Sequence, residues 1–187
     1  PALFNYATML HRRNDSARAV PVMEKLLAAE PRHPGYRNFH AVLLARLGEY
    51  ARAGRIYSEL LKEYPSQSKV WLSYGHTLKT AGKQDAAIAA YRKCIALDPS
   101  FGEAYWSLAN LKTFRFDADD VAAIQHQLER ADLDVAHRYH FEFSLGKALE
   151  DARDYAASFA HYERGNTLRL EVVPYNHALT SNRLRRA

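Results

Sequence analysis

The sequence has few of the residues that support several common classes of protein. Its only cysteine is Cys94, so no internal disulfide can form, and a reducing compartment such as the cytoplasm is expected. No uncharged apolar stretch approaches the ~18 residues that span a bilayer, and no basic-then-apolar signal segment is recognised after Pro1. These absences argue against a disulfide-stapled secreted domain and against a membrane partner.

Motifs of catalysis and cofactor binding are also missing. The eight glycines are scattered and form no GxxxxGK or GxGxxG phosphate loop, and there is no HExxH or paired CxxC motif. No strand-to-helix nucleophile elbow is visible. His137 and His140, which are three residues apart with Glu142 nearby, could suggest a metal, but an ordinary helix start is the favoured interpretation. We therefore expect no cofactor, no metal and no enzymatic activity of this chain.

The charge is basic but dispersed. There are 26 Lys and Arg against 21 Asp and Glu, a formal charge of +5, and the apolar share of 48% is ordinary for a globular domain. Nucleic-acid binders concentrate their cations on one face. The even spread therefore argues against a nucleic-acid partner.

A period of 34 residues runs through the sequence. It relates Pro31, Pro65 and Pro99, and the same step separates three further pairs: Gly48 and Gly82, Ala53 and Ala87, and Tyr57 and Tyr91. Proline cannot continue a helix, and glycine commonly ends one in the left-handed conformation. Each period therefore predicts two short helices, with the glycine after the first and the proline after the second. Such units bury their apolar faces only by stacking.

The unit with Trp71, Gly75, Ala87, Tyr91 and Pro99 resembles the tetratricopeptide repeat (TPR). The resemblance implies an all-α TPR solenoid, with antiparallel helix pairs stacked into a right-handed superhelix within a single domain, residues 1–187. Counting places five units at about 1–33, 34–67, 68–101, 102–138 and 139–173, followed by a C-terminal closing helix over 174–187. The fourth unit holds about three extra residues near 113–120, where Asp117 and Asp120 fit a helix N-cap better than a calcium loop.

A narrower resemblance covers about residues 100–170. The stretches 104–116, 140–151 and 155–166 look like the N-terminal TPR region of bacterial TPR–sulfotransferase proteins, in which a catalytic domain that uses the donor PAPS follows the repeats. This chain has no donor loop, so the resemblance implies a non-catalytic N-terminal arm of a longer protein, with the sulfotransferase domain as a further partner. The alternative is that this chain contributes to an active site completed by a missing C-terminal domain.

A ligand is expected on the inner wall formed by the first helices of the units. Position 5 of successive units places Asn38, Leu72, Trp106 and Phe143 there. The candidate groove residues for a protein or peptide ligand are Asn38, Arg46, Lys69, His76, Lys79, Trp106, Asn110 and Lys147. Dispersed cations, amides and an aromatic anchor predict an acidic or extended peptide, and the alternative is a wall that is merely solvated.

Overall fold

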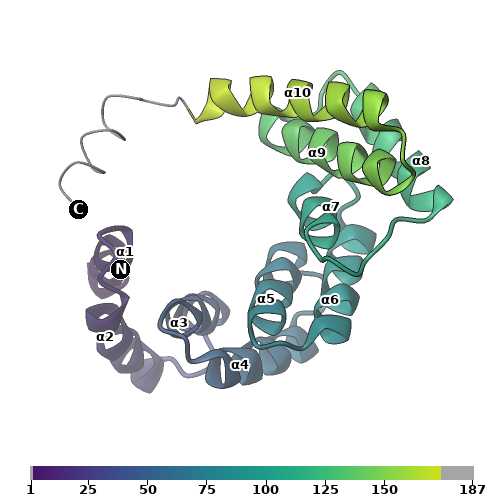
Figure 1. The fold of residues 1–187 in the computed structure, drawn as a ribbon. Coiled ribbons are helices and arrows are strands. Elements are labelled where there is room, and N and C mark those ends of the chain that lie inside the picture. The colour runs from purple at the N-terminus through teal and green to yellow at the C-terminus, as the bar shows by residue number, and fades with distance from the viewer. Residues whose placement is uncertain (1, 174–187) are drawn as a thin grey trace. The chain divides into compact units, whose positions relative to one another are not determined.

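The fold is known from a computed structural model, which describes residues 2–173. Within this range every regular element is a helix (Figure 1). The helices are α1 (Ala2–Arg12), α2 (Ser16–Ala29), α3 (Pro34–Arg46), α4 (Tyr50–Glu63), α5 (Ser68–Thr80), α6 (Gln84–Leu97), α7 (Gly102–Ala109), α8 (Ala118–Glu129), α9 (Val135–Asp151) and α10 (Tyr155–Val172). The predicted all-α solenoid is confirmed. The closing helix predicted for 174–187 lies outside the described residues.

Tight turns join four of the helix pairs with one repeated geometry. A residue of positive φ stands in each turn: Asn14 at 62°, Gly48 at 84°, Gly82 at 76° and Arg153 at 65°. In all four turns the amide of the next residue donates a 2.9 Å hydrogen bond to the carbonyl five residues before it. This bond closes the helix end and satisfies a carbonyl that would otherwise lack a partner. The left-handed glycines predicted at 48 and 82 are confirmed.

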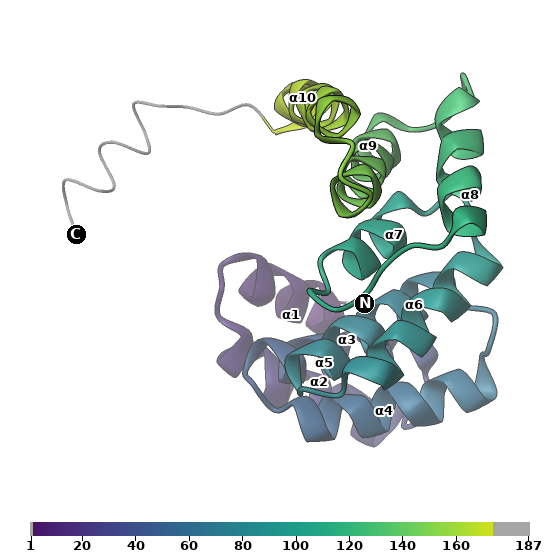
Figure 2. The same ribbon diagram turned by 45° about the vertical axis from the view of Figure 1, so that its right-hand side comes forward.

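The chain divides into two compact units, and each is described by itself. Unit 1, residues 1–98, holds α1 to α6, and its consecutive helices pack against one another (Figures 1 and 2). One buried cluster contains Ala7, Leu10, Ala19, Met23 and Leu43, and a second contains Ala41, Leu44, Ala53, Tyr57, Leu60, Leu61 and Val70. Small and large apolar residues thus alternate between adjacent helices, as repeat stacking requires.

Contact between α5 and α6 depends on a glycine facing a tyrosine. Tyr91 is fully buried, and a Cβ added at Gly75 would lie 2.6 Å from the Cδ1 atom of its ring. Tyr57, which stands 34 residues before Tyr91, is buried in the same way. Trp71 is only partly buried, and its Nε1 donates a 2.8 Å hydrogen bond to the carbonyl of Pro65.

Unit 2, residues 99–187, departs from the regular repeat over its described part. Helix α7 has only eight residues, and residues 110–117 form an irregular linker where the sequence predicted extra length. Helices α7, α8 and α10 all pack against α9. The predicted N-cap of α8 is confirmed, since the side chains of Asp117 and Asp120 each accept a hydrogen bond from the other residue's amide.

Candidate functional site

Two of the predicted groove residues meet at a cavity of unit 1. Arg46 at the end of α3 and His76 on α5 both line a space of about 430 Å³, which we call the α3–α5 cavity. Its lining residues are Val42, Ala45, Arg46, Tyr50, Tyr57, Ser73, His76, Thr77 and Thr80. The walls come from α3 and α5, the first helices of their repeats, and tyrosines of α4 complete the lining.

The polar groups of the α3–α5 cavity are donors and hydroxyls. Arg46 Nη2 donates to Asn14 Oδ1 at 3.1 Å, and His76 Nδ1 is hydrogen-bonded to the hydroxyl of Tyr91 at 3.0 Å. Burial raises the pKa of the Tyr57 hydroxyl, so that group stays neutral at any physiological pH. No carboxylate lines the cavity. The arrangement therefore favours an anionic group or a peptide carbonyl over a cation.

Asn38 lies at a different cavity, of about 350 Å³. The lining is formed by Pro34, Gly35, Asn38, Leu60, Tyr64, Gln67 and Val70. Asn38 Oδ1 is buried, and no hydrogen-bond partner for it is found within residues 2–173. A buried amide oxygen without a partner is costly, so Asn38 stands out among the mostly apolar residues that line this cavity.

The remaining predicted residues of unit 1 lie outside these cavities. Lys69 and Lys79 are both exposed, at opposite ends of α5. Leu72, which the sequence placed on the inner wall, is instead buried, with 6% of its surface exposed. The predicted row of inner-wall residues along α5 is therefore interrupted at Leu72.

In unit 2, Trp106 and Asn110 come from α7 and its end. Trp106 is partly buried, and its ring centroid lies 5.3 Å from that of Phe143 on α9. Asn110 is the exposed C-cap of α7. Phe143 was also expected on the wall, but only 7% of its surface is exposed, because Gly165 of α10 leaves room for its ring. Phe143 therefore does not lie on the inner wall as its repeat position predicted, because Gly165 lets its ring pack in the interior.

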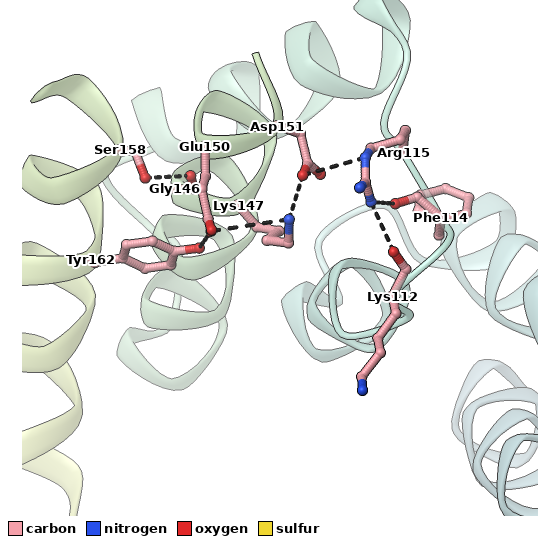
Figure 3. Close-up of polar contacts among 9 residues, drawn as sticks. All are labelled: Lys112, Phe114, Arg115, Gly146, Lys147, Glu150, Asp151, Ser158 and Tyr162. Atoms are coloured by element: carbon pink, nitrogen blue, oxygen red, sulfur yellow. Dashed lines mark hydrogen bonds and ion pairs between the residues drawn. The ribbon is translucent and has the colours of Figure 1, made fainter. Parts of the chain in front are cut away.

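Lys147 is held by acidic neighbours rather than presented to a ligand (Figure 3). Its ammonium contacts the carboxylate of Asp151 and lies 4.0 Å from Glu150 Oε2. Arg115 of the linker reaches the same Asp151 at 3.3 Å, and the Tyr162 hydroxyl donates to Glu150 Oε2 at 2.8 Å. Burial and the adjacent carboxylate raise the pKa of the Tyr162 hydroxyl, so it remains a donor. The charges of this cluster are balanced, and a net cationic surface at Lys147 is not supported.

A third cavity, of about 620 Å³, was not predicted from the sequence. It lies in unit 1 between α4 and α5, and we call it the α4–α5 cavity. The lining residues are Gly48, Tyr50, Ala51, Gly54, Arg55, Ser58, Tyr74, Thr77, Leu78, Ala81 and Lys83. The sequence signal that could have indicated this cavity is Gly54. The 34-residue pattern does not require a glycine at this position, and a glycine inside a helix usually has a packing or functional reason. The α4–α5 and α3–α5 cavities share Tyr50 and Thr77.

Residues 2–173 contain neither a metal-binding cluster nor a membrane-spanning helix. No group of three or more His, Cys, Asp or Glu is placed to bind a metal ion there. No helix in the same range combines the length and the hydropathy of a bilayer span.

Two families of known proteins match parts of the chain. Residues 7–68 match the family described as tetratricopeptide repeat, and residues 75–112 match a second family described as TPR repeat. The chain contains tetratricopeptide repeats. This confirms the TPR resemblance that the Trp71 unit carries. Neither match extends to a sulfotransferase.

The chain is also similar to individual proteins of known sequence or structure. The cell division cycle protein 27 homolog A of Arabidopsis thaliana is 27% identical over 99 residues, which are 53% of this chain but only 14% of that protein. MamA from Desulfovibrio magneticus RS-1 is 18% identical, with a TM-score of 0.65, and the match covers 91% of this chain and 94% of that one. BtubC from P. vanneervenii is 17% identical, with a TM-score of 0.69, over 93% of this chain and 81% of that one.

Proposed function

We propose that this TPR chain is a protein-interaction scaffold that binds an acidic, extended segment of a partner in the α3–α5 cavity of unit 1. TPR repeats form scaffolds suited to protein–protein interaction. The observation that supports an acidic segment in this cavity is that Arg46 and His76 both line it and no carboxylate does. Asn38 lies at another cavity of the same unit, which provides a second place for contact with the partner segment.

Binding of a labelled acidic peptide by fluorescence anisotropy tests this proposal. We expect the 187-residue protein to bind an Asp/Glu peptide more tightly than the same peptide with Asn and Gln. Arg46→Gln should weaken binding roughly tenfold, which corresponds to the loss of one charge-assisted hydrogen bond. Lys62→Gln, an exposed change on α4 away from both cavities, is the matched control.

Nucleic acid is the competing ligand to exclude. A random DNA duplex should bind more weakly than the acidic peptide at about 150 mM salt, because the cations of unit 1 are dispersed and nucleic-acid affinity falls steeply with salt. Tighter binding of the duplex, or an Arg46→Gln variant that binds the peptide like the parent protein, would contradict the proposal.

A second candidate is that the chain is the N-terminal arm of a bacterial, cytoplasmic sulfotransferase-containing protein. Its support is the resemblance over residues 104–116, 140–151 and 155–166, and the comparisons extend no further than the repeats. Under this proposal the scaffold is non-catalytic and the catalytic domain is an additional partner. The alternative is that this chain supplies residues to an active site shared with that domain.

Calorimetry with PAPS separates these two possibilities. A non-catalytic arm should show no measurable binding, because the chain lacks the glycine-containing loop whose amides would hold a phosphosulfate. Dispersed cations such as Lys69 and Lys79 provide only a weak attraction that salt screens. Micromolar binding to the 187-residue protein would instead favour a shared active site.

A further inference from the structure

Gly54 occupies the interior of α4 without a packing reason. Glycine is a poor helix former because it loses more backbone freedom than any other residue. At Gly75 the ring of Tyr91 explains the absence of a side chain. At Gly54 an added Cβ would meet only Tyr74 Cε2, at an ordinary contact distance of 3.9 Å. What the glycine does provide is open space, since Gly54 lines the α4–α5 cavity.

The α4–α5 cavity is positively charged. Arg55 and Lys83 are exposed lining residues from α4 and from the N-cap of α6. The lining contains no carboxylate. No ion pair of Arg55 or Lys83 is found within residues 2–173. Glu49 precedes the lining residue Tyr50, but its carboxylate is bound to Arg52 at 2.6 Å.

The first turn of α4 adds to the positive electrostatic potential of the cavity. Tyr50 and Ala51 begin the helix and line the cavity. The side chain of the N-cap residue, Glu49, makes no capping hydrogen bond. The amides of Tyr50 and Ala51 precede the first hydrogen bonds of the helix, which Arg52 and Ala53 donate to the Glu49 carbonyl, and the helix dipole is positive at this end. The open cavity, the two cations and these amides all favour the same kind of ligand, an anion.

We propose that the α4–α5 cavity is an anion pocket that binds a carboxylate side chain of an acidic peptide, with Gly54 allowing the peptide to approach the α4 backbone. The proposal rests on the proposed function, because it assigns a second contact to the same class of ligand. The shared residues Tyr50 and Thr77 make the two cavities neighbours. Unit 1 also has the matching charge, with 15 Lys and Arg against 8 Asp and Glu in residues 1–98.

The first test removes the charges of the pocket. With the 187-residue protein and the labelled Asp/Glu peptide, the double variant Arg55→Gln/Lys83→Gln should weaken binding roughly tenfold or more, as expected for lost charge-assisted contacts. The control pair Lys25→Gln/Lys62→Gln removes two exposed charges of unit 1 outside the three cavities. Equal losses of peptide affinity in the two double variants would overturn the proposed anion pocket.

The second test fills the pocket. Gly54→Leu should weaken peptide binding while the melting temperature stays equal to that of the parent or rises, since leucine is a better helix former. A loss of binding with a gain of stability cannot come from misfolding. Ala96→Leu, at an exposed position of α6, is the matched control and should leave binding unchanged. Unchanged binding in Gly54→Leu would contradict the proposal.

The two proposals fail in different ways. If Arg46→Gln weakens binding and neither Gly54→Leu nor Arg55→Gln/Lys83→Gln does, the α3–α5 cavity remains the site and the anion pocket is rejected. If the Asn/Gln peptide binds as tightly as the Asp/Glu peptide, both proposals are rejected.

Discussion

Tyr91 is a single side chain on which the contact between α5 and α6 depends. It is fully buried, its ring fills the space above Gly75, and its hydroxyl is hydrogen-bonded to His76 on the wall of the α3–α5 cavity. One residue therefore connects the packing of a repeat with the geometry of the proposed site.

Tyr91→Ala should reduce the free energy of unfolding by about 3 kcal/mol or more, as for other buried aromatic truncations. Tyr91→Phe keeps the ring and removes the hydroxyl with its hydrogen bond to His76, so its cost should be about 1 kcal/mol. Urea unfolding followed by circular dichroism measures both. Lys62→Ala, at an exposed position, should remain within ~0.5 kcal/mol of the parent. A Tyr91→Ala protein as stable as the parent would refute the packing argument.

His40 makes stability depend on pH. Burial lowers the pKa of its imidazole in the folded protein, and Arg52 lowers it further, while Glu24 and Glu49 oppose the shift. The unfolded chain therefore takes up a proton more readily as the pH falls, and the folded state loses stability below the unfolded pKa of about 6.5. We expect unfolding free energy to decrease from pH 7.5 to pH 5, and His40→Gln to flatten this decrease. His126→Gln, at an exposed position on α8, should leave the slope unchanged.

At the scale of the helix, two interior glycines have opposite roles. Gly75 of α5 faces the ring of Tyr91, and Gly54 of α4 faces the α4–α5 cavity. Gly54→Ala should stabilise the protein by up to about 1 kcal/mol, the usual difference in helix propensity. Gly75→Ala should destabilise it, because the new methyl group would overlap the Tyr91 ring. Thermal unfolding of the two variants compares them directly, and a destabilising Gly54→Ala would contradict the assignment.

The helix turns give a second prediction at this scale. Gly82 has a φ of 76°, where a β-branched residue is strained, and no neighbouring atom lies within 4 Å of an added Cβ. Gly82→Val should therefore cost about 1–3 kcal/mol through the backbone alone. Gly82→Asn should cost less, because asparagine tolerates the left-handed region, as Asn14 does in the α1–α2 turn. Equal unfolding midpoints for the two variants would argue against backbone strain.

Helices and turns could be predicted from the sequence because their causes are local. The 34-residue step, the prolines and Gly48 and Gly82 carry the pattern, and the extra length predicted near 113–120 overlaps the irregular linker of residues 110–117. The shortness of α7 was not predicted. The site depends on packing between helices, which no local pattern specifies. Leu72 and Phe143 share a repeat position with Asn38, yet their neighbours bury them. Lys147 was identified by position, although Asp151 and Glu150 follow it at the i,i+4 and i,i+3 spacings of helical ion pairs. Only the contact of Arg115 with the same Asp151 required the three-dimensional structure.

At the scale of the whole molecule, charge is divided unequally between the two units. Residues 1–98 carry a formal charge of +7, while residues 99–187, with 11 Lys and Arg against 13 Asp and Glu, carry −2. The net charge of +5 conceals this difference. An anionic partner is therefore expected to be attracted mainly to unit 1, with an association rate that falls as salt rises.

A polypeptide of residues 1–98 should be helical, unfold cooperatively and retain most of the affinity for the acidic peptide. The reason is that it contains three helix pairs, both buried clusters of unit 1 and all three cavities. Circular dichroism and anisotropy at low and high salt measure these properties. A folded 1–98 polypeptide without affinity would place the site elsewhere.

Gly54 also has a consequence for the evolution of the sequence. A single nucleotide change converts any glycine codon into an alanine codon, and alanine would strengthen α4. Mutation followed by selection for folding alone would therefore remove this glycine, while selection for an open pocket would keep it. Among descendants of this gene, loss of the glycine should accompany loss of the cations at positions 55 and 83, so that the three positions change as one inherited unit.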